Sequence, residues 1–162
     1  MIIKLNRGYE SIIDDDDFIR ISQYKWKVID NKGRSDLKYS VAYLKDKAIL
    51  MHRLIMNPPN DMCIDHIDGN GLNNQKSNLR QATHTQNLRN SKKKTPGSSI
   101  YKGVYFCPRI NHYRARITLD GKRISLGYFL SEKDAGLAYD KAAKELFGEF
   151  CNLNFPLLEN LP

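Results

Sequence analysis

Residues 63–87, CIDHIDGNGLNNQKSNLRQATHTQN, combine side chains that together could hydrolyse a phosphodiester bond. The carboxylate of Asp65 and the amide oxygen of Asn87 are hard donors, which suit a divalent cation such as magnesium or manganese. Phosphodiester hydrolysis also needs a base for the attacking water and a positive charge near the leaving 3′-oxygen. His66, directly after Asp65, carries an imidazole that titrates near neutral pH and can act as that base. These residues predict a metal-assisted hydrolytic site.

The elements expected around these residues would bring them together. Residues 64–67 have the pattern of a short strand, DGNGLNN is a loop rich in turn residues, and a second short strand is expected around Leu79. Thr83 and Gln86 have the spacing of a capping box, which marks the start of a helix. Asn87 would then lie in the first turn beyond the cap. The predicted order is strand, loop, strand, helix.

The other polar side chains of this region have structural explanations beside chemical ones. Asn78, expected on the second strand, could lock the loop or orient His66 through its amide. Asp68 fits a turn residue better than a metal ligand. His52 and His84 fit structural positions better than catalytic ones, although His52 could pack beneath a metal site.

The same residues resemble the HNH endonucleases, particularly the small phage and intron-encoded homing type. The pattern DHxDG…NN…NLR…T…N of that family is matched by Asp65-His66-Ile67-Asp68-Gly69, Asn73-Asn74, Asn78-Leu79-Arg80, Thr83 and Asn87. The segment MHRLIM at residues 51–56 resembles the one that precedes this pattern in the family. The resemblance extends over about residues 38–90.

This resemblance implies a ββα-metal fold that binds one magnesium-like ion through Asp65 and Asn87. His66 would be the general base and Asn78 a positioning residue. The final position of the pattern is Asn87 rather than His, a variant that occurs in the family. Many HNH proteins hold a structural zinc with pairs of cysteines. No zinc is expected here, because the cysteines of this chain are far apart in the sequence: Cys63, Cys107 and Cys151.

Positive charge is concentrated in the middle of the chain. Residues 89–125 carry ten Lys and Arg against one acidic residue, in a chain of net charge +8. This excess indicates either a solvated basic face or a surface that binds a polyanion, of which nucleic acid is the commonest. The run NSKKKTPGSS at residues 90–99 contains no apolar residue and is typical of a linker between domains. Lysines in such a linker would lie along phosphates.

Three strands and a helix are predicted after the linker. Residues 101–106, 112–119 and 122–129 alternate between apolar and polar side chains, and Asp120-Gly121 indicates a tight hairpin between the last two. Ser131 is a good N-cap and Gly148 a good C-terminal stop for the helix. A stripe of small and apolar side chains is expected to pack on the sheet: Ala135, Ala138, Ala142 and Leu146.

Alternation assigns the strand residues to two faces. The apolar face, which would meet the helix, carries Val104, Phe106, Tyr113, Ala115, Ile117, Ile124 and Leu126. The other face carries Tyr105, Arg114, Arg116, Thr118, Arg123 and Ser125. Acidic partners that would neutralise these arginines are missing. The pattern therefore favours a sheet that enters a DNA major groove over an ordinary solvated face.

Residues 101–156 resemble the APETALA2/ethylene-response-factor DNA-binding domain, through YKGVYFCPRINHYRARI, GKRISLGYF, AGLAYDKAAKELFGE and LNFP. The resemblance implies a three-stranded antiparallel sheet against one helix, with the sheet in the major groove. Tyr105, Cys107 and Ser125 stand where plant members contact bases through Arg, Arg and Trp, so sequence preference does not carry over. The residues expected to bind DNA are Lys92, Lys93, Lys94, Lys102, Tyr105, Arg109, Arg114, Arg116, Thr118, Arg123 and Ser125.

The first fifty residues are less informative. A hairpin with a turn at Lys45-Asp46-Lys47 is expected, and the run Asp14–Asp17 should cap a short helix in solvent rather than bind metal. No apolar run has the length of a membrane span, and Lys4 and Arg7 interrupt the only candidate for a signal peptide. A cytoplasmic protein is expected, in the host cytoplasm or nucleoid if a phage encodes it.

The sequence thus predicts an α+β protein with an HNH nuclease domain at 1–89, a basic linker at 90–99 and an APETALA2-like DNA-binding domain at 100–162. We expect it to nick double-stranded DNA with one magnesium or manganese ion and without an obligate protein partner. A phage or another mobile element is the expected source. One alternative is a non-catalytic, sequence-specific DNA-binding regulator with a degenerate HNH domain. The other, an RNA-binding protein, lacks support from RNP-type aromatic signatures.

Overall fold

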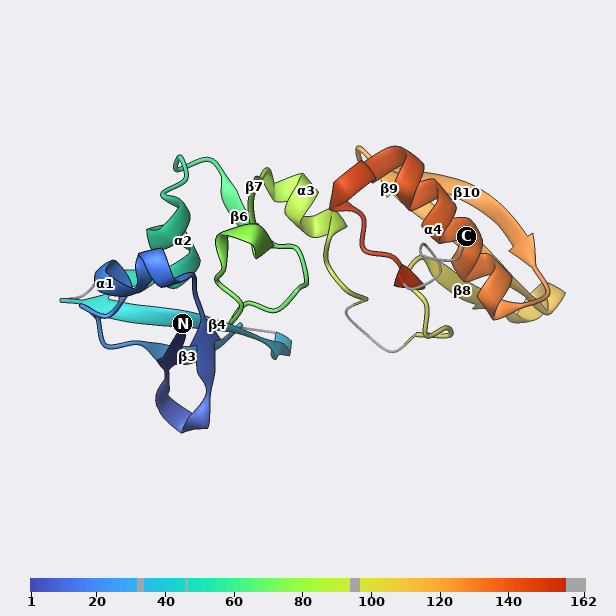
Figure 1. Cartoon of the computed structure of the whole chain (residues 1–162). Helices are drawn as coiled ribbons and strands as arrows, with labels where there is room; N and C mark the ends of the chain where they lie inside the picture. The colour runs from blue at the N-terminus through green and yellow to red at the C-terminus, as the bar shows by residue number, and fades with distance from the viewer. Residues whose placement is uncertain (32–33, 46, 94–96, 157–162) are drawn as a thin grey trace. The chain divides into compact units, whose positions relative to one another are not determined.

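The chain divides into two compact units. The computed structural model describes residues 1–31, 34–45, 47–93 and 97–156. The first unit is Met1–Leu88 and the second is Arg89–Pro162. Each combines small antiparallel sheets with few helices (Figure 1). The expected linker, of which residues 94–96 lie outside the described part of the chain, belongs to the beginning of the second unit.

Two of the small antiparallel sheets lie in the first half of the first unit. One pairs β1 (Ile2–Lys4) with β2 (Glu10–Ile12). The other has the order β3 (Lys27–Asn31), β4 (Arg34–Leu44) and β5 (Lys47–Leu50). The helices are α1 (Phe18–Ile21) and α2 (Met51–Met56). The β4–β5 pair confirms the predicted hairpin, although Asp46 of its turn lies outside the described residues.

The predicted order of strand, loop, strand and helix is present. β6 (Cys63–His66) pairs with β7 (Leu79–Ala82), and α3 (His84–Arg89) follows directly. The capping box before α3 is confirmed: the Thr83 N–H donates to Gln86 Oε1 at 2.8 Å, and the Gln86 N–H donates to Thr83 Oγ1 at 3.2 Å. These two bonds satisfy backbone donors that the first turn of a helix leaves open.

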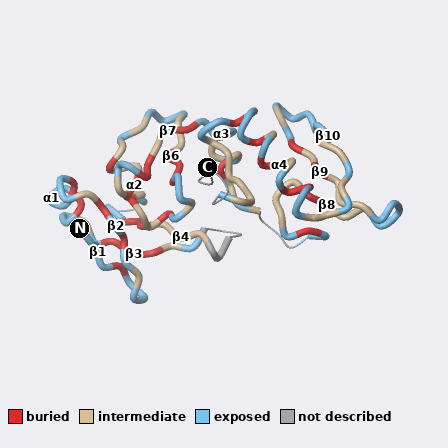
Figure 2. Tube along the Cα trace, turned by 45° about the vertical axis from the view of Figure 1, so that its right-hand side comes forward, coloured by how far each residue is buried: buried red, intermediate tan, exposed pale blue. Residues whose placement is uncertain are grey.

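One apolar core anchors the β6–β7 hairpin to the rest of the first unit. Ile64 and Leu79 from the hairpin, Met51 from α2 and the indole of Trp26 are all buried in it. Trp26 Nε1 donates to the carbonyl of Ile21 at 2.8 Å, so the polar atom of the ring is satisfied. Full burial of side chains of this size contributes about 1.5–3 kcal/mol each. Buried positions (red) occur in both units in Figure 2.

The acidic run at residues 14–17 is not simply solvent-exposed. The side chain of Asp17 is buried, with Oδ1 2.7 Å from Arg20 Nη2 and Oδ2 2.9 Å from Lys76 Nζ. Asp14 Oδ2 accepts from the backbone N–H of Lys76 at 2.7 Å. The prediction of solvent-exposed capping is therefore wrong for Asp14 and Asp17. Both carboxylates hold the turn before β7, which is about sixty residues away in the sequence.

The second unit is a three-stranded antiparallel sheet covered by one helix, as the sequence pattern predicts. The strand order is β10 (Lys122–Phe129), β9 (His112–Leu119) and β8 (Val104–Cys107). Helix α4 (Glu132–Phe147) begins after Ser131, whose Oγ accepts from the Asp134 N–H at 3.3 Å, and ends at Gly148. The first strand is shorter than expected, because it begins at Val104 rather than at residue 101.

The face of α4 that packs on the sheet contains most of the predicted stripe and is wider than it. Ala135 is buried, and Ala138 and Ala142 pack against the core half-buried, as expected, while Leu146 is exposed. The stripe did not include three further buried side chains that meet the sheet: Tyr139, Ala143 and Phe147. Gly103, just before β8, has φ +76°, and a Cβ there would collide with the Tyr139 ring. Glycine at this position therefore lets the chain pass directly under the helix.

A β-bulge in β10 shifts the register between Ser125 and Gly127. A bulge locally breaks the alternation of faces along a strand, so the faces change only for the residues that follow it. Ile124, before the bulge, pairs with the buried Ile117 and lies on the predicted face, although its side chain is exposed. Leu126 packs into the core as predicted.

The LNFP segment returns to the beginning of the second unit. The backbone N–H of Asn154 and the N–H of Phe155 donate to the buried Asp140 carboxylate, both at 2.9 Å. Asn154 Oδ1 accepts from the Lys102 N–H at 2.7 Å, and Asn154 Nδ2 donates to the Lys102 carbonyl at 3.2 Å. Residues 102 and 154 are thereby joined. Among the described residues, no helix is long and apolar enough to cross a membrane.

Candidate active site and nucleic-acid interface

His66, at the end of β6, is buried and held by a chain of buried polar side chains. Its Nε2 lies 3.4 Å from Asn74 Oδ1. Asn74 is fully buried, and its Nδ2 donates to Ser11 Oγ at 2.8 Å. Because the amide nitrogen of Asn74 is used in this way, its oxygen faces the imidazole and accepts from it. The network therefore assigns the tautomer of His66 with the proton on Nε2.

Two aromatic rings pack against His66. The ring of His52, from α2, meets the His66 ring edge-on, with centroids 5.1 Å apart. Tyr39, from β4, lies 5.8 Å from His66 and 5.5 Å from His52. A Cβ at Gly71 would collide with the Tyr39 ring and the Lys38 carbonyl, so the loop between β6 and β7 needs glycine there. The three rings and this loop form one packed cluster.

Burial keeps both imidazoles neutral. It lowers the pKa of His52 to about 3 and also lowers the pKa of His66, for which the hydrogen bond to Asn74 acts in the opposite direction. His52 Nδ1 is buried without a hydrogen-bond partner. A neutral imidazole is the form that can accept a proton, so the environment of His66 suits a general base near pH 7.

Asp65 is buried beside a cation from the same sheet. It is the register partner of Arg80 on β7, and its Oδ2 accepts from Arg80 Nε at 2.9 Å and from Nη2 at 2.7 Å. Arg80 was predicted only as part of the NLR pattern, and its ion pair with Asp65 was not predicted. Opposite charges on directly opposed residues of two antiparallel strands would indicate such a pair. This signal can be read only when the register of the two strands is known.

The hydrogen bonds of Asn78 brace the loop. It is the last residue of a 3₁₀ helix directly before β7, rather than a residue of the strand itself. Its Oδ1 accepts from the Asp68 N–H at 3.0 Å, and its Nδ2 donates to Asp68 Oδ1 at 3.0 Å and to the Asn73 carbonyl at 2.8 Å. Asp68 also accepts from the Asn70 N–H and from Asn73 Nδ2, as a turn residue does. The residue bonded to His66 is Asn74, which belongs to the NN part of the family pattern but was not predicted to contact the imidazole.

Asn87 is the fourth residue of α3 and is half-buried. Its backbone N–H donates to the Thr83 carbonyl at 3.0 Å. Among the described residues, no group of three or more His, Cys, Asp or Glu side chains is clustered to hold a metal ion. A site built from Asp65 and Asn87 would offer one carboxylate and one amide oxygen. That set fits a magnesium-like ion, which usually keeps several waters and binds substrate phosphate. Such an ion would share the Asp65 carboxylate with Arg80 or displace it.

Comparison with known proteins identifies the family of the chain. A family model described as HNH endonuclease matches residues 51–89, from α2 through α3. The chain is 36% identical over 154 residues to an uncharacterized HNH endonuclease of Acanthamoeba polyphaga mimivirus, covering 91% of this chain and 76% of that protein. The chain belongs to the HNH endonuclease family. The resemblance of residues 38–90 to the HNH endonucleases is thereby confirmed. The enzyme interpretation is favoured over a non-catalytic regulator.

A second viral relative matches part of the HNH endonuclease. Protein 3.8 of Escherichia phage T7 is 37% identical over 65 residues, which are 40% of this chain and 54% of that protein.

The open face of the sheet in this HNH endonuclease carries the predicted cationic side chains. Tyr105, Arg114 and Arg116 lie in register across β8 and β9, and Ser125 is the partner of Arg116 on β10. Thr118 and Arg123 form the next pair towards the β9–β10 turn. Tyr128, the β10 partner of Arg114, was not predicted, because the bulge brings it to this face. Arg109 is exposed on a short 3₁₀ helix between β8 and β9.

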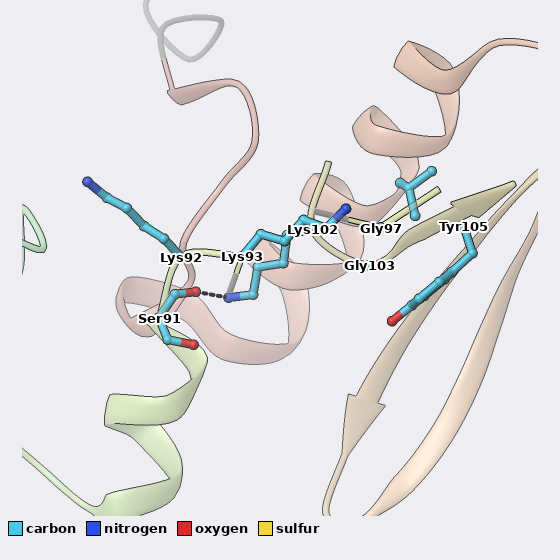
Figure 3. A pocket seen from close by; sticks show the side chains of 8 residues that line it. Ser91, Lys92, Lys93, Gly97, Lys102, Gly103 and Tyr105 are labelled. Atoms are coloured by element: carbon cyan, nitrogen blue, oxygen red, sulfur yellow. Dashed lines mark hydrogen bonds between the residues drawn. The ribbon is translucent and has the colours of Figure 1, made fainter. Parts of the chain in front are cut away.

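One pocket is lined by four of the residues predicted to bind DNA: Lys92, Lys93, Lys102 and Tyr105 (Figure 3). The pocket has a volume of about 300 Å³. Lys102 Nζ donates to the carbonyls of Arg89 and Ser91, both at 2.7 Å, and burial lowers its pKa to about 8. Lys93 Nζ donates to the Ser99 carbonyl. Lys92 is exposed, and Lys94 lies outside the described residues. Lys102 thus holds the backbone of residues 89–91, at the beginning of the second unit, next to the start of the sheet.

Proposed function

We propose that this HNH endonuclease hydrolyses a phosphodiester bond of double-stranded DNA with one divalent ion and cuts one strand each time it docks. The observation that carries the proposal is His66, a buried, neutral imidazole fixed by Asn74 next to Asp65 in the family-matched segment.

His66 would act as the general base. In the tautomer assigned above, its lone pair is on Nδ1, which would accept a proton from the attacking water. The water oxygen forms a bond to phosphorus, and the bond from phosphorus to the 3′-oxygen breaks. Asn74 would keep the ring in place by accepting from Nε2, and the rings of His52 and Tyr39 would prevent it from tilting. A base of this kind contributes about 10²–10⁴ in rate.

Asp65 and Asn87 would hold the ion. A bound divalent ion stabilises negative charge on the phosphate and on the leaving oxygen. Asn78 would act at a distance from the reacting atoms, since its hydrogen bonds fix the loop that carries Asn73 and Asn74. Arg80 would hold the Asp65 carboxylate in position when no ion is bound.

The second unit would dock on the duplex through the open face of its sheet and through Lys92, Lys93 and Lys94. The excess of basic residues in 89–125 supports this assignment. One active site in one chain would cut one strand per docking, so the expected product is nicked DNA.

A supercoiled plasmid tests the proposal. With magnesium or manganese, the purified chain should convert it to the open circular form, and excess EDTA should stop the conversion until the ion is restored. Asp65→Ala and Asn87→Ala should each raise the ion concentration needed for half-maximal rate. Undiminished nicking in EDTA would contradict the ion-dependent mechanism, and direct appearance of linear plasmid would contradict single-strand cutting.

A further inference from the structure

Two arginines on β9 point in the same direction from the open face of the sheet. Arg114 and Arg116 flank Ala115, which is fully buried and faces α4. Because side chains alternate along a strand, both arginines lie on the face opposite the helix. Residues i and i+2 on a strand are about 6.6–6.8 Å apart.

A tyrosine lies under each of these guanidinium groups. Arg116 Cζ is 4.0 Å from the centroid of the Tyr105 ring on β8, and Arg114 Cζ is 5.6 Å from that of Tyr128 on β10. Tyr105 is 41% exposed and Tyr128 is 52% exposed, so the rings form part of the surface. A guanidinium that stacks on a ring keeps its plane fixed while its N–H edge stays available for a planar acceptor.

Neither arginine has an acceptor of its own in the described part of the chain. No carboxylate or carbonyl there forms an ion pair or a hydrogen bond with Arg114 or Arg116, and Arg114 Nε is buried without a partner. Arg123, on the same face, is exposed, and within the described residues no ring lies beneath it. The two stacked arginines therefore differ from Arg123, whose side chain is held by neither a ring nor an acceptor.

We infer that Arg114 and Arg116 each read one guanine, and that the preferred DNA site contains two guanines within two base-pair steps of each other. The inference rests on the proposed docking of this face on duplex DNA. The O6 and N7 atoms of guanine form a planar acceptor pair in the major groove, which a fixed guanidinium meets with two N–H groups. Base pairs rise by about 3.4 Å, so the separation of the two residues corresponds to about two steps.

Tyr105 and Tyr128 are the positioning residues in this arrangement. Each would make its arginine specific by holding the plane of the guanidinium, without touching the base through its hydroxyl. Removal of the Tyr128 ring should therefore reduce the preference of Arg114 for guanine and leave that of Arg116 unchanged. Removal of the Tyr105 ring should do the reverse.

The test is selection of duplexes from a randomised pool by the full-length protein in EDTA. The wild-type protein should enrich two guanines within two base-pair steps. Arg114→Lys should lower the enrichment of one of these guanines by roughly 5- to 100-fold, and Arg116→Lys that of the other, while the affinity for unselected duplexes changes little because the charge remains. Tyr128→Ala should weaken only the guanine that Arg114→Lys weakens, and Tyr128→Phe should keep both. Arg123→Ala should weaken binding to all sequences alike.

The outcomes separate this inference from the docking it rests on. If the protein binds duplex DNA but the enriched bases are the same in the wild-type protein and both lysine variants, guanine reading is refuted and docking stands. If the full-length protein retains no duplex of any sequence at low salt, both are refuted. Circular dichroism of each variant, compared with the wild type, excludes misfolding as the cause of a lost preference.

Discussion

The functional residues proposed for the two units differ in burial and in hydrogen bonding. In the first unit, His66, Asp65 and Asn74 are buried, and each is bonded to a neighbouring side chain. In the second unit, the arginines of the open sheet face have no acidic partner among the described residues, and the rings of Tyr105 and Tyr128 are exposed. The polar groups of the first unit already have side-chain hydrogen-bond partners, whereas Arg114 and Arg116 have no acceptor among the described residues.

This difference separates the two kinds of defect that substitutions should cause. Groups held by a buried network affect the position of reacting atoms, so their loss should appear in rate or in folding stability. Exposed cations that pair only with a ligand should appear in affinity and in its dependence on salt. Substitutions in each unit therefore test whether the contrast extends to function.

The largest expected effect is on rate. His66→Ala should lower the nicking rate by about 10²–10⁴ and leave DNA affinity nearly unchanged, because a general base is lost while the docking face is intact. His84→Ala is the matched control, since His84 is an exposed histidine in the neighbouring helix. Single-turnover nicking and gel-shift titration measure the two quantities. A His66→Ala protein that cuts at the wild-type rate would remove His66 from the mechanism.

Loss of Arg80 should unfold the first unit more easily. Arg80→Ala should lower its free energy of unfolding by about 3–5 kcal/mol, because Asp65 would stay buried without that cation. Urea unfolding can be followed by the fluorescence of Trp26, the single tryptophan, which is buried in the core of this unit. Arg7→Ala is the control: the Arg7–Asp30 pair is exposed, and its loss should cost about 0–1 kcal/mol.

Unfolding of Arg80→Ala in the presence of magnesium tests whether Asp65 binds the ion. If Asp65 binds the ion, magnesium should restore part of the lost stability in Arg80→Ala and stabilise the wild type less. Equal shifts in both proteins would argue against Asp65 as a ligand.

Low pH should reduce the folding stability of the first unit through the buried His52. The pKa of His52 is about 3 in the folded chain and near 6.5 when unfolded, so the unfolded state binds more protons between these values. The free energy of unfolding should fall as pH drops below about 6.5, by about 1.4 kcal/mol per pH unit for one histidine, or about 2 kcal/mol at pH 5. His52→Phe should remove this part of the loss, and His84→Ala should not. An unchanged pH dependence in His52→Phe would show that His52 is not the group responsible.

The smallest effects should come from single exposed cations of the second unit. Lys92→Ala, Arg109→Ala and Arg123→Ala should each reduce the slope of log affinity against log salt by about 0.9, with no change in nicking at saturating protein. Lys133→Ala is the control, because Lys133 is exposed on α4, which covers the other face of the sheet. Salt titrations in which all four variants keep the wild-type slope would contradict docking through the second unit.

The sequence predicts those features that local chemistry determines. Asp120-Gly121 predicts the β9–β10 hairpin, Ser131 the start of α4, and Thr83 with Gln86 the start of α3, because each depends on a few neighbouring residues. The residues that contact His66 depend instead on tertiary structure. His52 and Tyr39 come from other elements, and the link from Asn74 to Ser11 spans 63 residues.

Register and bulges explain the remaining differences. The Asp65–Arg80 pair becomes visible only when β6 and β7 are aligned, which the loop between them determines. One extra residue in β10 brings Tyr128 to the face that strict alternation assigns differently. The predicted stripe on α4 was incomplete, because the rings of Tyr139 and Phe147 fill the space beneath the helix together with the small residues.

The hydrogen bonds of Asn154 to both the N–H and the carbonyl of Lys102 have an architectural consequence. Residues 102 and 154 are therefore neighbours, and Asp140 fastens residues 154 and 155 to α4. A unit with adjacent ends can be inserted into a loop of another protein without stretching the host chain. Residues 101–156, which begin and end near this junction, therefore have the geometry of a segment that can be transferred to another protein in one piece, together with the proposed docking face.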